Sequence, residues 1–290
     1  MKVHMKYPIL LTLIEHKYLK HHFEDERTSA DVYKALYLQG EQLKDDRVVH
    51  WRPLAARPNR DERGVGWKDA NSCWLTQDEH TFQVTAGQDP VPVELPRGLT
   101  SASGRFVWTV EQSAEEATLL QQLDRQSGET STIWEHPGWA GLSLASDPAQ
   151  DRLLWSYSGY HLSGPLHSWN PIAAQKEAVP TGFAEGVSDL AFSPNGKNLA
   201  FVHDHQVYCL SNGATRPISG PRSNSFNYRQ QPSWSPDSKR LFYVNAHYDI
   251  VGYLMQESYQ WMAALPDGSQ HRALISRSAV AAVNVGPALD

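Results

Sequence analysis

Histidines offer the most conspicuous candidate chemistry in this chain, which carries 13 of them. His203 and His205 flank an aspartate between two predicted strands, residues 199–202 and 207–210. Two imidazoles at that spacing could share a metal ion, but a zinc site needs three or four ligands. We therefore interpret the segment as a polar hairpin turn and predict neither a metal site nor any other cofactor.

Nucleophilic and phosphate-binding motifs are missing from the sequence. No Gly-x-Ser-x-Gly nucleophile elbow occurs, and the segment closest to it, around Ser143, lies within a predicted strand. Neither glycine-rich type of phosphate-binding loop is present. Cys73 and Cys209 both fall in predicted strands, where cysteine usually acts as a small buried hydrophobe. The sequence therefore predicts a protein that is not an enzyme.

Composition narrows the function classes further. Hydrophobic residues make up 40% of the 290 residues, which is enough to form a core. Lys and Arg number 26 against 32 Asp and Glu, and the resulting charge of −6 argues against direct nucleic-acid binding. Two cysteines are typical of a reducing compartment. Because the apolar run at residues 7–14 is too short for a signal peptide or a membrane span, we expect a cytoplasmic protein with no membrane partner.

A repeat organises the elements that would position any site. Residues 190–202 return as residues 232–244, with Pro194 and Pro236 separated by 42 residues. That period is typical of propeller blades, and each copy predicts a strand, a tight Ser-Pro-Asx turn and a second strand. Weaker copies of the pattern lie at residues 66–75, 100–108, 144–155 and, truncated, 283–290.

Six first strands can be counted in these copies, which predicts an all-β fold with a single six-bladed β-propeller domain over residues 1–290. The truncated last copy suggests that the closing blade is shared between the N- and C-termini, an arrangement that removes exposed sheet edges. The expected blades span about 64–96, 97–136, 138–180, 186–219 and 229–276, and the closing blade combines 279–290 with 7–52.

The turns Ser193-Pro-Asn-Gly-Lys197 and Ser235-Pro-Asp-Ser-Lys239 resemble the propeller repeat of the TolB family, which is rich in Pro-Asp and similar to WD40 repeats. Two copies match well, over about residues 187–275. The resemblance implies a propeller that binds or gates, because the family includes envelope proteins and propeller domains attached to serine peptidases. We expect this chain to have neither a TolB-type N-terminal domain nor a hydrolase domain, and fold alone does not imply function.

Long insertions concentrate on one predicted face, which we call the insertion face. This face carries the loops that join second to third strands, such as residues 246–258, and the connections between blades, such as residues 220–231. Its loops combine aromatic and acidic residues, as protein interfaces do. The predicted partner-binding residues are Glu24, Asp25, Glu26, Glu115, Glu116, Tyr157, Tyr160, His161, Phe183, Glu185, Phe226, Tyr228, Tyr248, Asp249 and Tyr253.

The sequence thus favours a non-catalytic, monomeric protein-binding propeller. The specific hypothesis is a cytoplasmic immunity protein that neutralises a basic bacterial toxin, such as a nuclease, because acidic loops speed the capture of a cationic partner. One alternative is a propeller enzyme, or a small-ligand or metal binder, that uses the central channel. Another is a TolB-like envelope accessory protein.

Overall fold

The computed structural model describes residues 9–14, 33–37, 47–50, 66–69, 72–77, 80–85, 91–93, 98–158, 164–184, 186–220, 227–235, 237–251, 254–277 and 280–285. Every regular element in these ranges is a β-strand, and the strands form four-stranded sheets. The all-β prediction is therefore confirmed. The described part of the chain contains no helix that is long and apolar enough to cross a membrane.

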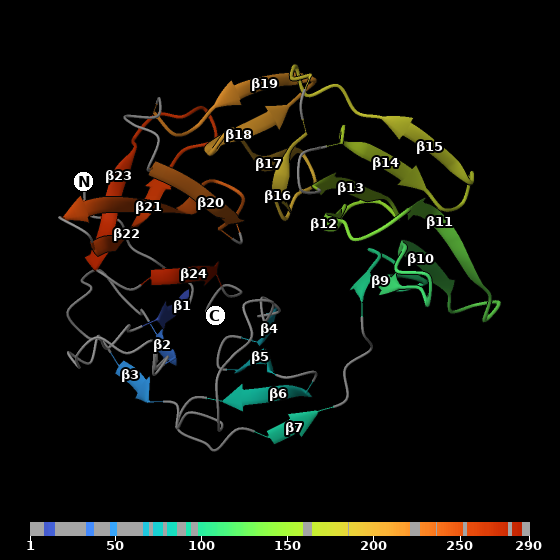
Figure 1. Ribbon diagram of the computed structural model, residues 1–290, viewed down its shortest axis with the longest axis horizontal. Helices are drawn as coiled ribbons and strands as arrows, with labels where there is room; N and C mark the ends of the chain where they lie inside the picture. The colour runs from blue at the N-terminus through green and yellow to red at the C-terminus, as the bar shows by residue number, and fades with distance from the viewer. Residues whose placement is uncertain are drawn as a thin grey trace. The chain divides into compact units, whose positions relative to one another are not determined.

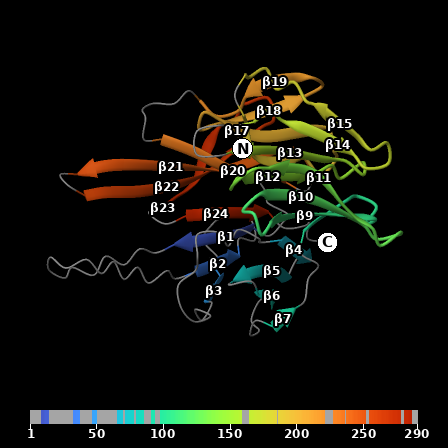
Figure 2. The ribbon, with the colours of Figure 1, turned by 45° about the vertical axis from the view of Figure 1, so that its right-hand side comes forward.

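The first of two compact units comprises Met1–Leu95, Val244–Ala263 and Arg272–Asp290. In one of its sheets β24, the last of the described strands, pairs antiparallel with β1, the first of them (Figure 2). The order of this sheet is β24 (Val280–Val285), β1 (Ile9–Ile14), β2 (Tyr33–Tyr37) and β3 (Arg47–His50). A second sheet contains β4 (Gly66–Asp69), β5 (Ser72–Gln77), β6 (His80–Thr85) and β7 (Val91–Val93).

The second unit comprises Pro96–Tyr243 and Ala264–His271. Figure 1 shows three of its sheets following one another in chain order, from green to orange. The first of these sheets contains β8 (Leu99–Thr100), β9 (Phe106–Gln112), β10 (Thr118–Asp124) and β11 (Thr130–His136). The second contains β12 (Gly141–Ser146), β13 (Leu153–Ser158), β14 (His167–Asn170) and β15 (Gln175–Ala178). The third contains β16 (Ser188–Phe192), β17 (Asn198–His203), β18 (Gln206–Ser211) and β19 (Ala214–Pro217).

One more sheet has the order β20 (Asn227–Trp234), β21 (Leu241–Val251), β22 (Leu254–Ala264) and β23 (Arg272–Arg277). Residues 246–258, predicted as a long loop, belong largely to β21 and β22. This correction has a local cause, because the segment is rich in aromatic and branched side chains that favour strands. Tyr228, predicted in a connection between blades, likewise lies in β20.

The Ser-Pro-Asx repeat forms the predicted turn between β16 and β17. The Ser193 hydroxyl donates to Oδ1 of Asn195 at 2.8 Å and accepts from the backbone N–H of Asn198 at 2.9 Å. The same Oδ1 accepts from the N–H of Lys197 at 3.0 Å. Because Ser193 is fully buried, these bonds satisfy a hydroxyl that would be costly to bury alone.

The second full copy makes the same bonds between β20 and β21. The Ser235 hydroxyl donates to Oδ1 of Asp237 at 2.6 Å and accepts from the N–H of Arg240 at 2.9 Å. The N–H of Lys239 donates to Oδ1 of Asp237 at 3.1 Å. The repeat therefore encodes one hydrogen-bonded turn twice, as predicted.

The weaker copies keep the turn with altered side chains. Ser101 accepts the N–H of Phe106 on its hydroxyl at 3.2 Å. Asp147 takes the place of the serine in the next copy, where its carboxylate accepts from the N–H of Ala149 at 2.9 Å and from Nη2 of Arg152 at 2.6 Å. The turn is thus retained although the copy at Ser101 lacks the proline and the copy at Asp147 lacks the serine.

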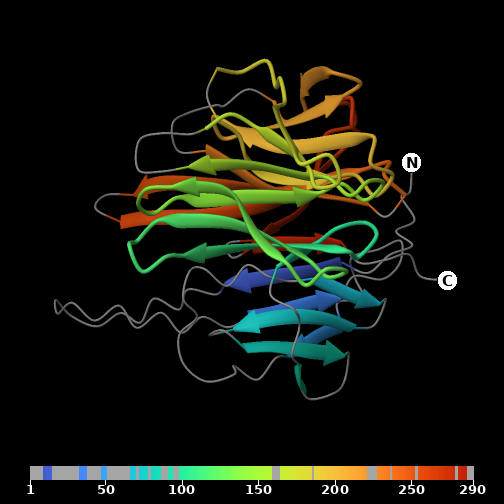
Figure 3. The same ribbon diagram turned by 90° about the vertical axis from the view of Figure 1, so that its right-hand side faces the viewer.

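Neighbouring repeat turns contact one another and so form one face of the second unit, which we call the repeat-turn face. The N–H of Ser103 donates to Oδ1 of Asp151 at 2.8 Å, and the N–H of Asn195 donates to Oγ of Ser238 at 3.1 Å. At Gly196 a Cβ would lie 2.8 Å from the Cβ of Ala149, so the close approach of these two turns requires glycine. In Figure 3 the green strands run back and forth across the unit. The repeat turns therefore lie at one end of these strands, and the loops of the insertion face lie at the other end.

Tryptophans pack between successive sheets. Trp108 of β9 and Trp155 of β13 are both 0% exposed and belong to one core cluster. Trp234 of β20 is buried, and its Nε1 donates to the carbonyl of Ala191 in β16 at 3.0 Å. A second cluster around Leu199 and Phe201 joins β17 to the preceding sheet.

Candidate functional site

The turn between β9 and β10 presents two glutamates on the insertion face. Glu115 and Glu116 are exposed, and Glu116 adopts a left-handed backbone conformation with a φ of 64°. The Ser113 hydroxyl accepts from the N–H of Glu115 at 3.2 Å and from that of Ala117 at 3.1 Å. These bonds hold the turn, so the two carboxylates project from a fixed base.

An exposed tryptophan, which the sequence analysis missed, lies next to this turn. Trp139 is 63% exposed in the connection between β11 and β12. The hydroxyl of Thr118, the first residue of β10, donates to the carbonyl of Gly138 at 2.9 Å and accepts from the N–H of Ala140 at 2.9 Å. Both bonds fasten the backbone on either side of Trp139 beside the Glu115–Glu116 turn. A sequence signal existed, since Pro-Gly directly after a strand predicts an exposed turn.

Tyr157 packs into a cluster rather than standing free. Its ring centroid lies 5.3 Å from that of Trp134 and 5.5 Å from that of His136. A side chain at position 164 would collide with the Tyr157 ring, so Gly164 leaves the space that the ring occupies. These contacts make Tyr157 half-buried and give it a packing role beneath the insertion face.

Phe183 is also half-buried and stacks on His203, with ring centroids 4.0 Å apart and an interplanar angle of 20°. Its edge contacts Tyr208 at a centroid distance of 4.8 Å, and it packs against the core cluster around Phe201. Among the predicted residues whose side chains are described, the two glutamates are thus exposed and the two aromatic residues are largely packed.

For the remaining predicted residues, the structure describes no side-chain positions. Tyr228, Tyr248 and Asp249 are placed as backbone in β20 and β21. Another eight lie outside the described residues: Glu24, Asp25, Glu26, Tyr160, His161, Glu185, Phe226 and Tyr253.

The His203–His205 segment is the predicted hairpin turn. His203 pairs with Gln206 across β17 and β18, which leaves Asp204 and His205 as a two-residue connection with φ of 42° and 59°. Positive φ at both positions is the conformation that joins two tightly paired strands. Within the described ranges, no group of three or more His, Cys, Asp or Glu side chains could hold a metal ion.

No protein-family model matches this sequence, and no curated protein matches it in sequence either. Solved structures do match. TolB from Acinetobacter baumannii aligns with a TM-score of 0.63 and 14% identity over 97% of this chain and 67% of that chain. A putative TolB from Agrobacterium tumefaciens aligns with a TM-score of 0.56 and 13% identity over 81% of this chain and 85% of that chain.

The chain has a TolB-like β-propeller fold. A chain in the crystal structure of a nidogen–laminin complex also aligns, with a TM-score of 0.58 and 10% identity over 96% of this chain and 98% of that chain. At these identities the likeness establishes the fold alone. The function of this TolB-like propeller therefore depends on the chemistry of its own surfaces.

One prediction concerns the free thiol of this TolB-like propeller. Cys209 in β18 is 1% exposed, and burial raises the pKa of its thiol to about 11. Because the thiolate is the reactive form, we expect Cys209 to resist iodoacetamide in the folded protein and to react after unfolding. Peptide mapping by mass spectrometry checks this residue separately from Cys73. Rapid labelling of folded Cys209 would contradict the buried placement.

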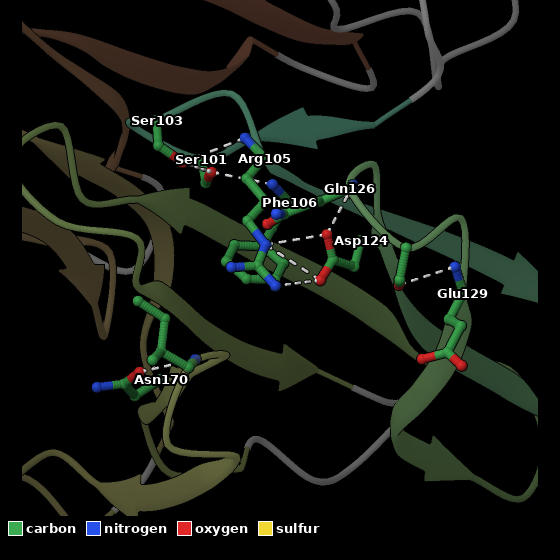
Figure 4. A network of polar contacts seen from close by, with 10 residues as sticks. Ser101, Ser103, Arg105, Phe106, Asp124, Gln126, Glu129 and Asn170 are labelled. Atoms are coloured by element: carbon green, nitrogen blue, oxygen red, sulfur yellow. Dashed lines mark hydrogen bonds and ion pairs between the residues drawn. The ribbon is translucent and has the colours of Figure 1, made fainter.

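A second prediction concerns acid stability. Arg105 binds Asp124 on the repeat-turn face, with Nη2 2.6 Å from Oδ2 and Nε 3.0 Å from Oδ1 (Figure 4). Hydrogen bonds from the guanidinium hold the pKa of Asp124 at about 2, below its ordinary 3.8. A depressed folded-state pKa stabilises the protein above the unfolded value and is lost as pH falls through the folded one.

We therefore expect part of the free energy of unfolding to disappear as the pH falls from about 4 to about 2. Asp124→Asn should lose less over this window than the wild type, because it has no carboxyl group to protonate at this position. Urea unfolding at a series of acidic pH values measures both profiles. Parallel profiles for the two proteins would show that the ion pair contributes nothing to acid stability.

Proposed function

We propose that the four-stranded sheets are the blades of a closed six-bladed ring whose last blade combines both ends of the chain. The pairing of β24 with β1 supports this arrangement, because a sheet built from the two termini joins the ends of a circular fold. The regular four-strand order of the sheets supports it as well.

This ring acts as a non-catalytic protein-binding module, and the partner docks on the insertion face. The observation that carries the proposal is Trp139, a large apolar side chain that is 63% exposed on a backbone fastened at both sides by Thr118. Tryptophan on a rigid support is the residue most often found to dominate binding energy at protein interfaces. Its exposure serves no packing purpose within the described structure.

The partner in this proposal is basic. Glu115 and Glu116 lie in the turn that precedes Thr118, whose hydroxyl fastens the backbone around Trp139, and the chain carries a net charge of −6. Such charges mainly increase association rates with a cationic protein. The specific role that we propose is a cytoplasmic immunity protein, monomeric by itself, which binds and neutralises a basic bacterial toxin domain such as a nuclease.

A pull-down from the native host tests the proposal. The tagged chain and its Trp139→Ala variant are compared at low and moderate salt, and bound proteins are identified by mass spectrometry. We expect one stoichiometric basic protein that is retained less well at moderate salt and is lost with the variant. Co-expression then tests the immunity role, because the partner should be toxic without this chain and harmless with it.

Two other results would redirect the assignment. A partner that binds the variant as well as the wild type would remove the insertion face from consideration. Absence of any protein partner would favour the central channel, and screens for metals and small ligands would follow.

A further inference from the structure

A polar groove of about 460 Å³ opens on the repeat-turn face of the second unit, opposite the insertion face. The β8–β11 sheet forms one side, and the turn between β14 and β15 forms the other. The lining that matters here comes from Arg105, Gln122, Asp124, Glu129, Ser131 and Ile172. The proposed protein-binding function leaves this groove unused.

Gln122 is the most informative of these residues. Its side-chain Oε1 accepts two indole N–H groups, from Trp108 at 3.1 Å and from Trp169 of the next sheet at 2.7 Å. Indole nitrogens can only donate, so the amide is fixed with its oxygen toward the tryptophans and its NH₂ group away from them. Gln122 is 7% exposed and lines the groove, and its NH₂ group makes no hydrogen bond within the described structure. A nearly buried donor is thereby directed toward the groove.

Arg105 and Asp124 add a neutral pair at the groove wall (Figure 4). Nε and Nη2 of the guanidinium are engaged by the Asp124 carboxylate, whereas Nη1 makes no hydrogen bond among the described residues. The guanidinium carbon also lies 4.8 Å from the centroid of the Phe106 ring, a cation–π contact. The pair therefore offers a donor beside carboxylate acceptors without net charge.

An apolar ridge faces these polar groups. Asn170 Oδ1 accepts the backbone N–H of Ile172 at 3.0 Å and that of Ala173 at 3.1 Å, which holds the β14–β15 turn. The Ile172 side chain is 74% exposed at the groove. A ligand in the groove would thus meet hydrogen-bonding groups on one side and a branched aliphatic chain on the other.

We propose that this groove binds a neutral saccharide of one or two sugar units. A sugar hydroxyl both donates and accepts, which suits the mixture of Gln122 NH₂, Arg105 Nη1, Ser131 hydroxyl and Glu129 carboxylate. An anion is disfavoured because Arg105 is already paired and the Glu129 carboxylate adds negative charge. The apolar C–H face of the sugar packs on Ile172. The volume falls within the range of small-ligand sites.

The two indoles that hold Gln122 supply a direct readout. Binding at the Gln122 NH₂ group polarises the amide, so the indole N–H signals of Trp108 and Trp169 should shift together in ¹⁵N–¹H spectra. The probes are methyl β-D-glucoside, methyl β-D-galactoside, methyl α-D-mannoside, lactose and sucrose, each titrated into the full chain. Glucuronate serves as the anionic counterpart. We expect saturable shifts with at least one neutral sugar and none with glucuronate.

Variants distinguish the groove from nonspecific effects. Ser131→Ala combined with Ile172→Ala removes one hydroxyl and the apolar ridge at exposed positions, and we expect about tenfold weaker binding. Trp139→Ala is the matched control on the other face and should bind the sugar as the wild type does. Because Trp139→Ala is expected to lose the protein partner but to keep the sugar, the protein-binding proposal and the saccharide proposal can fail independently of each other.

Three outcomes would overturn the saccharide proposal. The indole signals could stay unchanged with every neutral sugar up to its solubility limit. Glucuronate could shift them in place of the neutral sugars. Binding could also persist undiminished in the Ser131→Ala, Ile172→Ala variant.

Discussion

Replacing Trp234 with alanine is expected to lower the free energy of unfolding by about 3–5 kcal/mol. The side chain is 5% exposed between β20 and β16, and its Nε1 donates to the Ala191 carbonyl at 3.0 Å. Truncation would leave a large cavity between two sheets and an unsatisfied carbonyl group. Urea unfolding followed by circular dichroism measures the change.

Two further variants isolate the cause of that loss. Trp234→Phe keeps most of the apolar volume but removes the indole donor, so we expect an intermediate loss of about 1–3 kcal/mol. Trp139→Ala removes the same kind of side chain from an exposed position and should change stability by no more than about 0.5 kcal/mol. A near-neutral Trp234→Ala variant would be incompatible with tryptophan packing between sheets.

Loss of partner binding in Trp139→Ala is the second large effect that we expect. A buried interface tryptophan typically contributes 2 kcal/mol or more, so the dissociation constant should rise about 30-fold or more. The side chain is exposed in the free protein, and Thr118 fixes its backbone, so the variant should remain folded. Surface plasmon resonance against the captured partner gives both rate constants.

Charge reversal in the Glu115–Glu116 turn should change mainly the rate of association with the partner. Glu115→Lys with Glu116→Lys is expected to slow association with a basic partner and to reduce the salt dependence, while dissociation changes less. Glu177→Lys in the exposed outer strand β15 is compared with Glu115→Lys alone, because each of these variants reverses one charge and only Glu115 lies in the turn beside Trp139. Equal effects of the two single variants would show that only total charge matters.

Much of the local structure followed from short sequence patterns. The Ser-Pro-Asx segments at 193 and 235 form the same turn because all its bonds join residues no more than five apart. The His203–Gln206 hairpin was predictable for the same reason. One local prediction was wrong: residues 246–258 were expected to be a loop because the insertion is long, although their composition favours strands.

Contacts between distant residues decided which side chains remain available for binding. Tyr157 and Phe183 had the composition of interface residues, but packing against Trp134, His136 and His203 leaves each of them half-buried. Gln122 gave no signal in the sequence, because its role depends on Trp169, 47 residues away on the next sheet. Such contacts follow from the stacking of sheets, which no local pattern encodes.

The sequence by itself therefore determined the all-β class and the repeated turns, since the chemistry of these turns acts over a few residues. The tertiary structure decided the rest. It left Trp139 exposed beside Glu115 and Glu116, and it fixed the amide of Gln122 between two indoles. The exposure of a side chain and the direction of its hydrogen bonds depend on which sheets pack against each other. This packing forms only when the whole chain has folded.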